Sequence, residues 1–140
     1  MPVKLLLDTN PKQADLDAVV KGLTEFNAAK AGDLGHSKFA VFLRDDSGSV
    51  VGGLKASIEF KWLHVEILWL SDSLRGGGWG SKLLAAAEAH GRKSGCVNAW
   101  LDTFSFQAPG FYRKQGYTEY GSLKDFPPGH TRYFFVKKLR

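Results

Sequence analysis

The sequence predicts an α/β (α+β) protein built on one mixed sheet of about six to seven strands, with helices on the faces of the sheet. Three observations predict this fold. Short apolar and β-branched runs, separated by turn residues, fill much of the first half of the chain. In the second half, such runs alternate with segments whose apolar residues recur at helical spacing. Finally, 140 residues with 44% hydrophobic and 24% charged residues suffice for one buried core, so we expect a single domain over residues 1–140.

The first half predicts a strand, a helix and an antiparallel meander. The apolar run at residues 3–7 predicts a strand, and a helix follows from about Pro11, a residue favoured in the first helical turn, to Ala31. Strands at residues 38–44, 50–60 and 62–70 make the meander, with a tight turn at residues 45–48. Gly52 and Gly53 indicate a bulge or a close backbone approach within the second of these strands. Apolar residues recur at helical intervals in the predicted helix: Leu16, Val19, Val20, Leu23 and Phe26.

The second half predicts two helices among three strands. A glycine-rich loop at residues 71–80 leads into a helix at residues 81–93, which Gly95 caps. A buried strand at residues 97–104 is followed by a short helix at residues 108–115, closed by Gly116. The last strands are expected at residues 117–121 and 131–139. This order, a meander followed by alternating strands and helices, is what predicts a mixed sheet.

Composition excludes several classes of protein. The net charge of +5 comes from 19 basic and 14 acidic residues that are scattered along the chain. This scatter favours a solvated basic surface, then a small phosphate-bearing ligand, over nucleic-acid binding. Cys96 is the single cysteine, which excludes an intramolecular disulfide and a multi-thiolate zinc site, and the histidines lack metal-ligand spacing, so we expect no metal. No apolar run approaches the ~20 residues of a membrane span, and the N-terminal run is too short for a signal peptide. We therefore expect a cytoplasmic protein.

The glycine-rich loop has the properties of a phosphate cradle. Four glycines lie between Arg75 and Ser81, directly after a strand and directly before a helix. Glycine lets a ligand approach the backbone closely, and the first N–H groups of a helix lack intrahelical partners and lie at the positive end of its dipole. Neither the Walker pattern nor the dinucleotide pattern fits, because Ser81 stands where the first requires lysine and the second requires glycine.

The chain resembles the GNAT superfamily of N-acetyltransferases in four features that occur in the family's order. The pattern Arg75-Gly76-Gly77-Gly78-Trp79-Gly80 resembles the family's acetyl-CoA pyrophosphate loop, and the strand before it ends in Leu68-Trp69-Leu70. A buried strand follows the helix, and the segment from Ala108 to Tyr117 resembles the family's Ala-x-x-Phe-Tyr-x-x-x-Gly-Phe signature, with Tyr117 in place of phenylalanine. The resemblance implies a splayed pair of central strands and acetyl-CoA as cosubstrate.

The resemblance also implies which residues hold acetyl-CoA. Where many members have a cofactor-contacting asparagine this chain has Ser105, and Gln107 is the alternative. The implied set is Leu68, Trp69, Leu70, Arg75, Gly76, Gly77, Gly78, Trp79, Gly80, Ser81 and Ser105.

Three side chains are candidates for catalysis. Tyr112 matches the family tyrosine that donates a proton to the departing thiolate, and a phenol stays protonated at neutral pH. Glu66 is our preferred base, acting directly or through water, and His64 is the second candidate. Because the two residues lie two apart on a strand, they share a face, with Leu68 and Leu70 continuing that register unless a bulge intervenes. By resemblance, the Leu70 N–H would hold the oxyanion. A structural thiol is the favoured role of Cys96 over an acyl-cysteine intermediate.

These features predict an N-acetyltransferase that moves an acetyl group to a primary amine of a small molecule or protein by direct attack in a ternary complex. A non-catalytic module that binds CoA is the alternative, and a nucleic-acid-binding domain ranks third. In the family, acceptor specificity comes from regions that correspond to residues 26–37 and 122–132, and the aromatic residues that could line an acceptor pocket are Phe104, Phe106 and Phe126. Homodimers are common among relatives, and the sequence does not decide the oligomeric state.

Overall fold

The computed structural model describes residues 2–140. The chain divides into two compact units, one ending at Leu34 and the other formed by Gly35–Arg140. We describe each unit by itself. No helix among the described residues is long and apolar enough to span a membrane.

The first unit consists of one helix and the segment that precedes it. Helix α1, Gln13–Ala31, confirms the predicted helix, and the N–H of Asn10 donates to Asp8 Oδ1 at 2.9 Å in the bend before it. The strand predicted at residues 3–7 is wrong, because this segment has no regular structure and Leu5 is 94% exposed. A strand needs a neighbour to take up its N–H and C=O groups, and no described strand pairs with residues 3–7.

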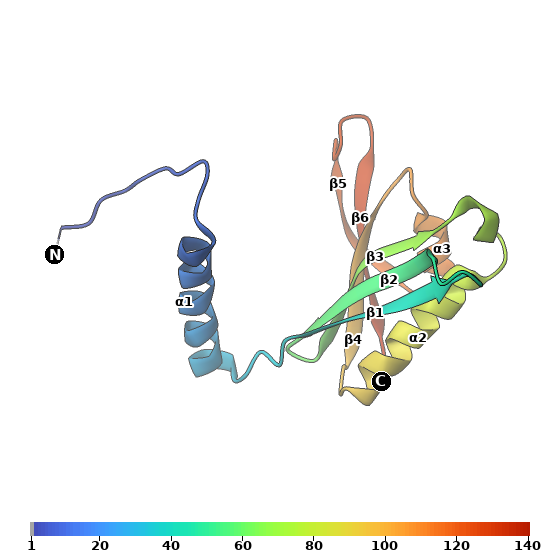
Figure 1. Ribbon diagram of the computed structural model, residues 1–140, viewed down its shortest axis with the longest axis horizontal. Coiled ribbons are helices and arrows are strands. Elements are labelled where there is room, and N and C mark those ends of the chain that lie inside the picture. Colours follow the sequence, from blue (N-terminus) through green and yellow to red (C-terminus); the bar gives the residue numbers. More distant parts are fainter. Residues whose placement is uncertain (1) are drawn as a thin grey trace. The chain divides into compact units, whose positions relative to one another are not determined.

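The second unit is built on a six-stranded mixed sheet with the order β1-β2-β3-β4-β6-β5 (Figure 1). Its first three strands form the predicted antiparallel meander, β3 and β4 are parallel, and β6 is antiparallel to both β4 and β5. The sheet confirms the predicted fold class. Its strands are β1 Ser37–Arg44, β2 Val50–Glu59, β3 Trp62–Leu70, β4 Asn98–Phe104, β5 Thr118–Lys124 and β6 Thr131–Lys138.

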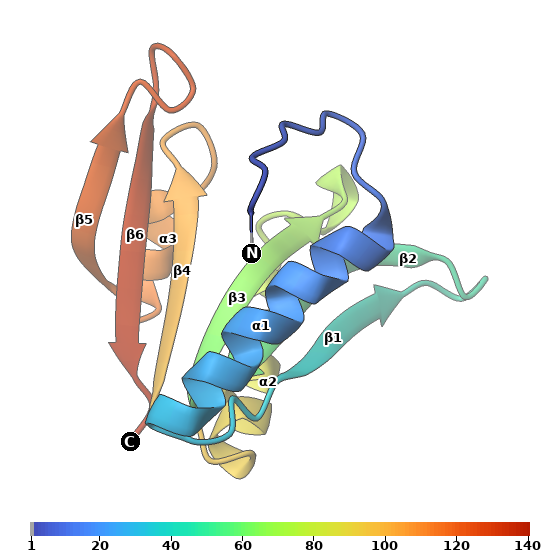
Figure 2. The ribbon, with the colours of Figure 1, turned by 90° about the vertical axis from the view of Figure 1, so that its left-hand side faces the viewer.

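Helices α2 (Trp79–Lys93) and α3 (Pro109–Lys114) lie on one face of this sheet (Figure 2). Apolar residues of α2, including Leu83 and Ala87, share one buried cluster with Leu63 of β3 and Phe135 of β6. A short 3₁₀ helix, Asp72–Leu74, lies in the loop before α2. Helix α2 begins two residues before the predicted start at residue 81, because Gly78 adopts a left-handed φ of 81° and serves as the N-cap.

The parallel strands β3 and β4 pair only at one end. Trp62 to Val65 pair with Asn98 to Leu101, and beyond that point β3 and β4 diverge (Figure 2). The pairing of β3 with β2 shifts at the same place, since Val65 faces Ala56 whereas Ile67 faces Lys55. Glu66 is therefore the extra residue of a β-bulge. The sheet is splayed in its centre, as the family resemblance implies.

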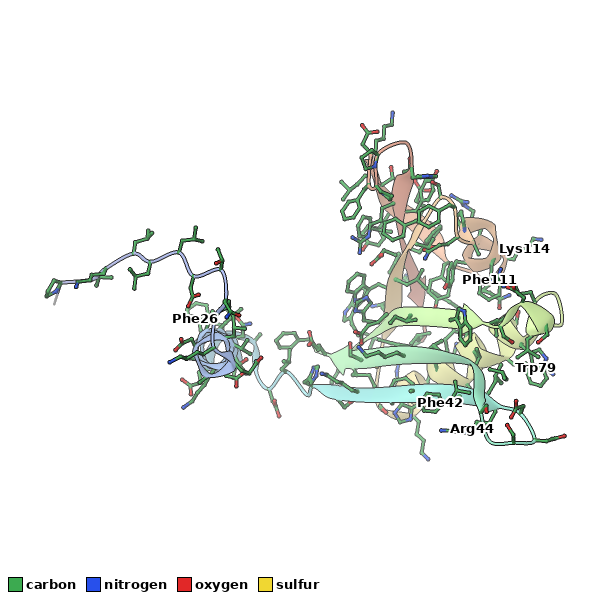
Figure 3. The ribbon with its side chains drawn as sticks, turned by 45° about the horizontal axis from the view of Figure 1, so that its top comes forward. Phe26, Phe42, Arg44, Trp79, Phe111 and Lys114 are labelled. Atoms are coloured by element: carbon green, nitrogen blue, oxygen red, sulfur yellow. The ribbon has the colours of Figure 1, made fainter. Side chains whose placement is uncertain are left out.

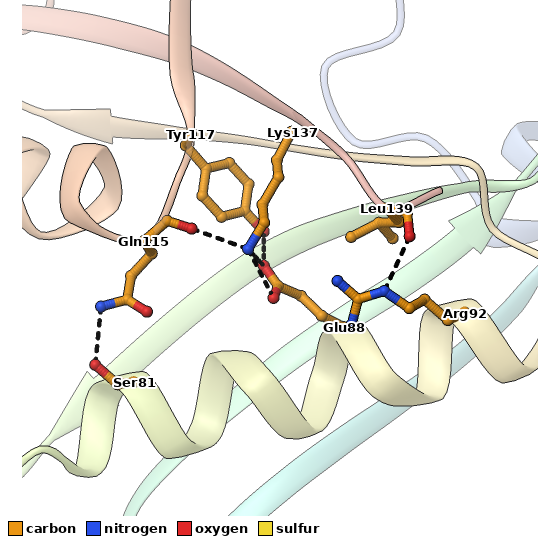
Figure 4. A network of polar contacts seen from close by, with 7 residues as sticks. All are labelled: Ser81, Glu88, Arg92, Gln115, Tyr117, Lys137 and Leu139. Atoms are coloured by element: carbon orange, nitrogen blue, oxygen red, sulfur yellow. Dashed lines mark hydrogen bonds and ion pairs between the residues drawn. The ribbon is translucent and has the colours of Figure 1, made fainter.

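A buried polar network joins α2 to the far side of the splay (Figure 4). Glu88 of α2 accepts a hydrogen bond from the Tyr117 hydroxyl at 2.7 Å and pairs with Lys137 Nζ of β6 at 3.0 Å. Lys137 also donates to the backbone carbonyl of Gln115 at 2.9 Å, and the Gln115 amide donates to Ser81 Oγ at 2.9 Å. The side chain of Glu88 is 7% exposed, so its carboxylate oxygens depend on these partners rather than on water for hydrogen bonds.

We expect Lys137→Ala to lower the free energy of unfolding by about 3 kcal/mol, because it leaves the Glu88 carboxylate buried without its cation. Urea denaturation of both proteins measures the difference. Lys138→Ala, which removes an exposed neighbouring lysine, is the matched control and should cost less than about 0.5 kcal/mol. Equal losses in the two variants would contradict the structural role of the network.

Candidate active site

The splay between β3 and β4 opens into a cleft of about 780 Å³. Its walls come from the end of β3, the loop before α2, the start of α2, the end of β4 and helix α3. Of the sequence-predicted cofactor residues, Gly77 and Ser105 are not among those that line the cleft. The predicted residues that do line it are Leu68, Trp69, Leu70, Arg75, Gly76, Gly78, Trp79, Gly80 and Ser81, and the predicted catalytic residues Glu66 and Tyr112 line it with them.

The loop before α2 presents a row of backbone N–H groups. Within the described chain, no hydrogen bond takes up the N–H groups of residues 76–81, whereas Lys82 N donates to Gly78 O and begins the helical ladder. Lys82 Nζ lies 4.4 Å from the centre of the Trp79 ring and so adds a positive charge near this turn. Free N–H groups, a helix start and a nearby cation are together suited to bind an anion.

Gly80 has a packing role that the sequence does not reveal. A Cβ on Gly80 would lie 3.3 Å from the Phe111 ring, so this glycine lets α3 approach the first turn of α2. Phe111 and Trp79 flank the beginning of α2 in Figure 3. Gly80→Val would therefore disturb this packing as well as hinder the approach of a ligand to the turn.

The backbone of β3 faces the open splay at two residues. Ser71 N donates to Val51 O at 2.9 Å, and in an antiparallel pair successive residues point alternately toward and away from the partner strand. The N–H and C=O groups of Leu70 and Leu68 therefore point away from β2, toward β4. Since β4 no longer pairs with β3 there, these groups line the cleft.

Tyr112 combines a buried ring with a position on the cleft wall. The residue is 9% exposed, and its ring contacts those of Phe111, Tyr117 and Phe135. Burial, reinforced by the negative charge of Asp102, raises the pKa of Tyr112 to about 12. The phenol is therefore protonated across the neutral range and can donate a proton.

Glu66 and His64 share one face of the sheet, but of the two only Glu66 lines the cleft between β3 and β4. Burial alone would raise the pKa of Glu66. The hydrogen bond and charge of Lys55, whose Nζ is 3.3 Å away, act together with a hydrogen bond from Ser57 and the charge of His64 to hold that pKa below its usual value. His64 stacks on Trp100 with ring centres 3.8 Å apart, and burial lowers its pKa even though Glu66 and Asp102 oppose the shift. Leu68 and Leu70 pack toward the opposite, helix-covered face, because the bulge at Glu66 reverses the alternation.

Gln107, rather than Ser105, lies in the cleft. Gln107 Oε1 accepts hydrogen bonds from Thr103 Oγ1 at 3.0 Å and Phe104 N at 2.8 Å, which fixes the side chain and leaves its NH₂ group as a donor. Ser105 Oγ instead accepts from Thr131 N at 3.0 Å and ties the end of β4 to β6. Ser105, which stands at the position of the family asparagine, thus holds β4 and β6 together in this chain.

Asp102 is a cleft residue that the sequence analysis missed. Its Oδ1 accepts from Arg132 at 2.8 Å, and the Arg132 guanidinium lies 4.7–5.4 Å from three aromatic ring centres. The available signal was an acidic residue within an otherwise apolar strand, on the face opposite Leu101 and Thr103. Of the aromatic residues predicted to line an acceptor pocket, Phe104 contacts both Phe106 and Phe126, and Phe106 lines the cleft.

Cys96 is fully buried in the core, and burial raises the pKa of its thiol.

Comparison with known proteins agrees with this geometry. Residues 10–117 match the model of the acetyltransferase (GNAT) family. The chain is 42% identical over 102 residues to a blasticidin-S acetyltransferase of Streptomyces morookaense, covering 72% of this chain and 75% of that protein. The crystal structure of an acetyltransferase from Bacillus cereus superposes with a TM-score of 0.86 at 32% identity, covering 95% of this chain and 97% of the other. An aminoglycoside 6′-N-acetyltransferase complexed with coenzyme A shares the fold, with a TM-score of 0.63 at 19% identity and coverage of 74% and 73%.

The mixed sheet of this chain has the fold of acetyltransferases. The chain belongs to the acetyltransferase (GNAT) family, and we conclude that it is an acetyltransferase.

The negative charge of Glu66 affects the pKa of its neighbour His64. In Glu66→Gln, we expect the pKa of His64 to fall further below its usual value, because the mutation removes a negative charge that stabilises the protonated ring. Titration of the histidine ring protons by NMR measures this shift. Glu119→Gln, which alters a carboxylate paired with Arg113, should leave His64 unchanged, and an unchanged pKa in Glu66→Gln would contradict the placement of Glu66.

Proposed function

We propose that this acetyltransferase binds acetyl-CoA in the cleft between β3 and β4 and transfers the acetyl group to the primary amine of a small molecule. The observation that carries the proposal is the row of free N–H groups at residues 76–81, which suits the pyrophosphate of CoA. The cleft continues from this turn along Leu70 and Leu68 to Glu66 and Tyr112. A thioester on the pantetheine arm would therefore meet both candidate catalytic groups.

In the proposed reaction the neutral amine attacks the thioester carbonyl carbon, so that a C–N bond forms as the carbonyl π electrons move to oxygen. The Leu70 N–H, which points into the splay, would stabilise this oxyanion. Collapse of the intermediate breaks the C–S bond, and the Tyr112 hydroxyl gives its proton to the thiolate. The Glu66 carboxylate takes the proton lost by the amine, through a water molecule, and proton exchange with solvent restores both groups.

A small-molecule acceptor is favoured by the relatives. The Streptomyces protein acts on blasticidin S, as its name states, and the structural neighbour with bound coenzyme A is an aminoglycoside acetyltransferase. The proposal is tested by incubating the protein with acetyl-CoA and a panel of amines that includes blasticidin S and an aminoglycoside. The release of free CoA is the measurement. Saturable CoA binding without transfer to any amine would instead support the non-catalytic alternative.

Tyr112→Phe should lower kcat by roughly 10²-fold or more, because the phenylalanine keeps the buried ring but cannot protonate the thiolate. The wild-type kcat should show no loss from tyrosine ionisation up to about pH 10, since the pKa of Tyr112 is raised to about 12. Steady-state kinetics at saturating acetyl-CoA measure both effects. Wild-type turnover in the variant would remove Tyr112 from the mechanism.

Gln107→Glu should raise the KM for acetyl-CoA by about tenfold, because the carboxylate keeps the accepted hydrogen bonds from Thr103 and Phe104 but loses the NH₂ donor that faces the cleft. Ser105→Ala is the matched control and should leave that KM unchanged, since Ser105 Oγ bonds Thr131 instead. The reverse result would restore Ser105 as the cofactor contact.

A further inference from the structure

A second cavity, of about 570 Å³, lies on the opposite face of the sheet from α2. It is formed by the beginning of β1, the β2–β3 turn, the outward side chains of β3 and Trp100 of β4. Glu66, the bulge residue, lines both this cavity and the cofactor cleft. The two cavities therefore meet at the residue that is proposed to accept the proton of the attacking amine.

One wall of the second cavity is aromatic. His64 and Trp100 are stacked nearly parallel, at 7°, and Trp62 lies two residues before His64 on the same face of β3. Trp62 is 38% exposed and Phe60 is 40% exposed. Flat aromatic surfaces of this kind favour flat, unsaturated ligands and organic cations.

The β2–β3 turn holds Phe60 at the cavity at a conformational cost. Phe60 and Lys61 form the two-residue turn of the hairpin, with φ angles of 49° and 63°. Such turns normally carry asparagine or glycine, because the left-handed region is unfavourable for bulky residues. An aromatic side chain kept in a strained turn at the edge of a cavity is more readily explained by ligand contact than by folding.

The other side chains around the second cavity include two carboxylates, each of which has a basic partner. Glu59 accepts from His36 Nδ1 at 2.9 Å, and Glu66 is paired with Lys55. Lys38 also lines the cavity. The two carboxylates can bind an ammonium group, and Glu66 lies at the end of the cavity nearest the cleft, where the reacting amine must be.

We propose that this second cavity is the acceptor site and that it takes a primary amine carried on a flat, unsaturated ring. The ring would lie against Phe60, Trp62 and the His64–Trp100 stack, with the amine directed toward Glu66. This inference rests on the proposed function and deepens it, because it places acceptor recognition mainly on strands β1 to β4. Of residues 26–37 and 122–132, where the family resemblance placed it, only His36 lines this cavity.

A matched pair of acceptors tests the class of ligand. Benzylamine and cyclohexylmethylamine carry the same ammonium group on rings of similar size, and only the first ring is flat and aromatic. At saturating acetyl-CoA, we expect the KM for benzylamine to be about fivefold lower. Equal KM values, or a lower value for cyclohexylmethylamine, would overturn the proposed class.

Two variants test the location. Phe60→Asn removes the aromatic ring and places a residue suited to positive φ in the turn, so the thermal unfolding midpoint should be maintained or raised while the KM for benzylamine rises about fivefold. Trp62→Leu should raise the same KM without changing the KM for acetyl-CoA. Phe42→Leu alters an exposed aromatic residue of β1 that lines neither cavity, and it should change neither constant. Unchanged KM values for benzylamine in both Phe60→Asn and Trp62→Leu would overturn the site.

A binding measurement separates this inference from the proposed function. Benzylamine should shift the NMR signal of the His64 ring saturably, whether or not acetyl-CoA is present. Such a shift without acetyl transfer to any amine would contradict the proposed function and leave the site standing. Acetyl transfer without a His64 shift would contradict the site and leave the proposed function standing.

Discussion

The separation of β3 from β4 produces the cleft of this protein. Parallel pairing stops at Val65 and Leu101, where Glu66 enters β3 as a bulge residue. The bulge reverses the alternation of side chains, so that residues beyond it turn Leu68 and Leu70 toward the helices. The same two residues then direct their backbone groups into the gap. One extra residue thus opens the cleft, supplies its polar backbone and places a carboxylate at its inner end.

A sheet that is open in its centre needs other contacts to join its halves. On the helix-covered face, Glu88 of α2 is bonded to Tyr117 and to Lys137 of β6, and Gln115 at the end of α3 is bonded to Ser81 at the start of α2. These bonds cross the line along which β3 and β4 have separated. They also link the anion-binding turn to the helix that carries Tyr112, so the network that stabilises the fold also fixes the relative positions of the turn and the proposed proton donor.

Most of the fold could be predicted because its helices and strands follow from the local spacing of apolar residues along the chain. The six strands and three helices follow from apolar spacing and turn residues, and the family motifs place the cleft along the chain. Three features depend on contacts that no local pattern specifies. The bulge at Glu66 exists only relative to β2, the role of Gly80 depends on Phe111, and the exchange of Ser105 for Gln107 depends on which of them β6 binds. At residues 3–7 the apolar pattern is typical of a strand, but pairing partners rather than pattern decide whether a strand forms.

The two groups proposed for proton transfer have pKa values displaced in opposite directions, and for different reasons. Burial dominates at Tyr112 and disfavours the phenolate, which preserves a proton for the departing thiolate. At Glu66 burial raises the pKa, but the hydrogen bonds from Lys55 and Ser57 and the positive charges of Lys55 and His64 together outweigh it and keep the carboxylate ionised, ready to accept a proton. When the pKa values of two groups are shifted in opposite directions, one group can act as an acid and the other as a base at the same pH. Because these partners keep Glu66 charged, its carboxylate is suited to receive, through a water molecule, the proton that the attacking amine loses, which is consistent with its position between the two cavities.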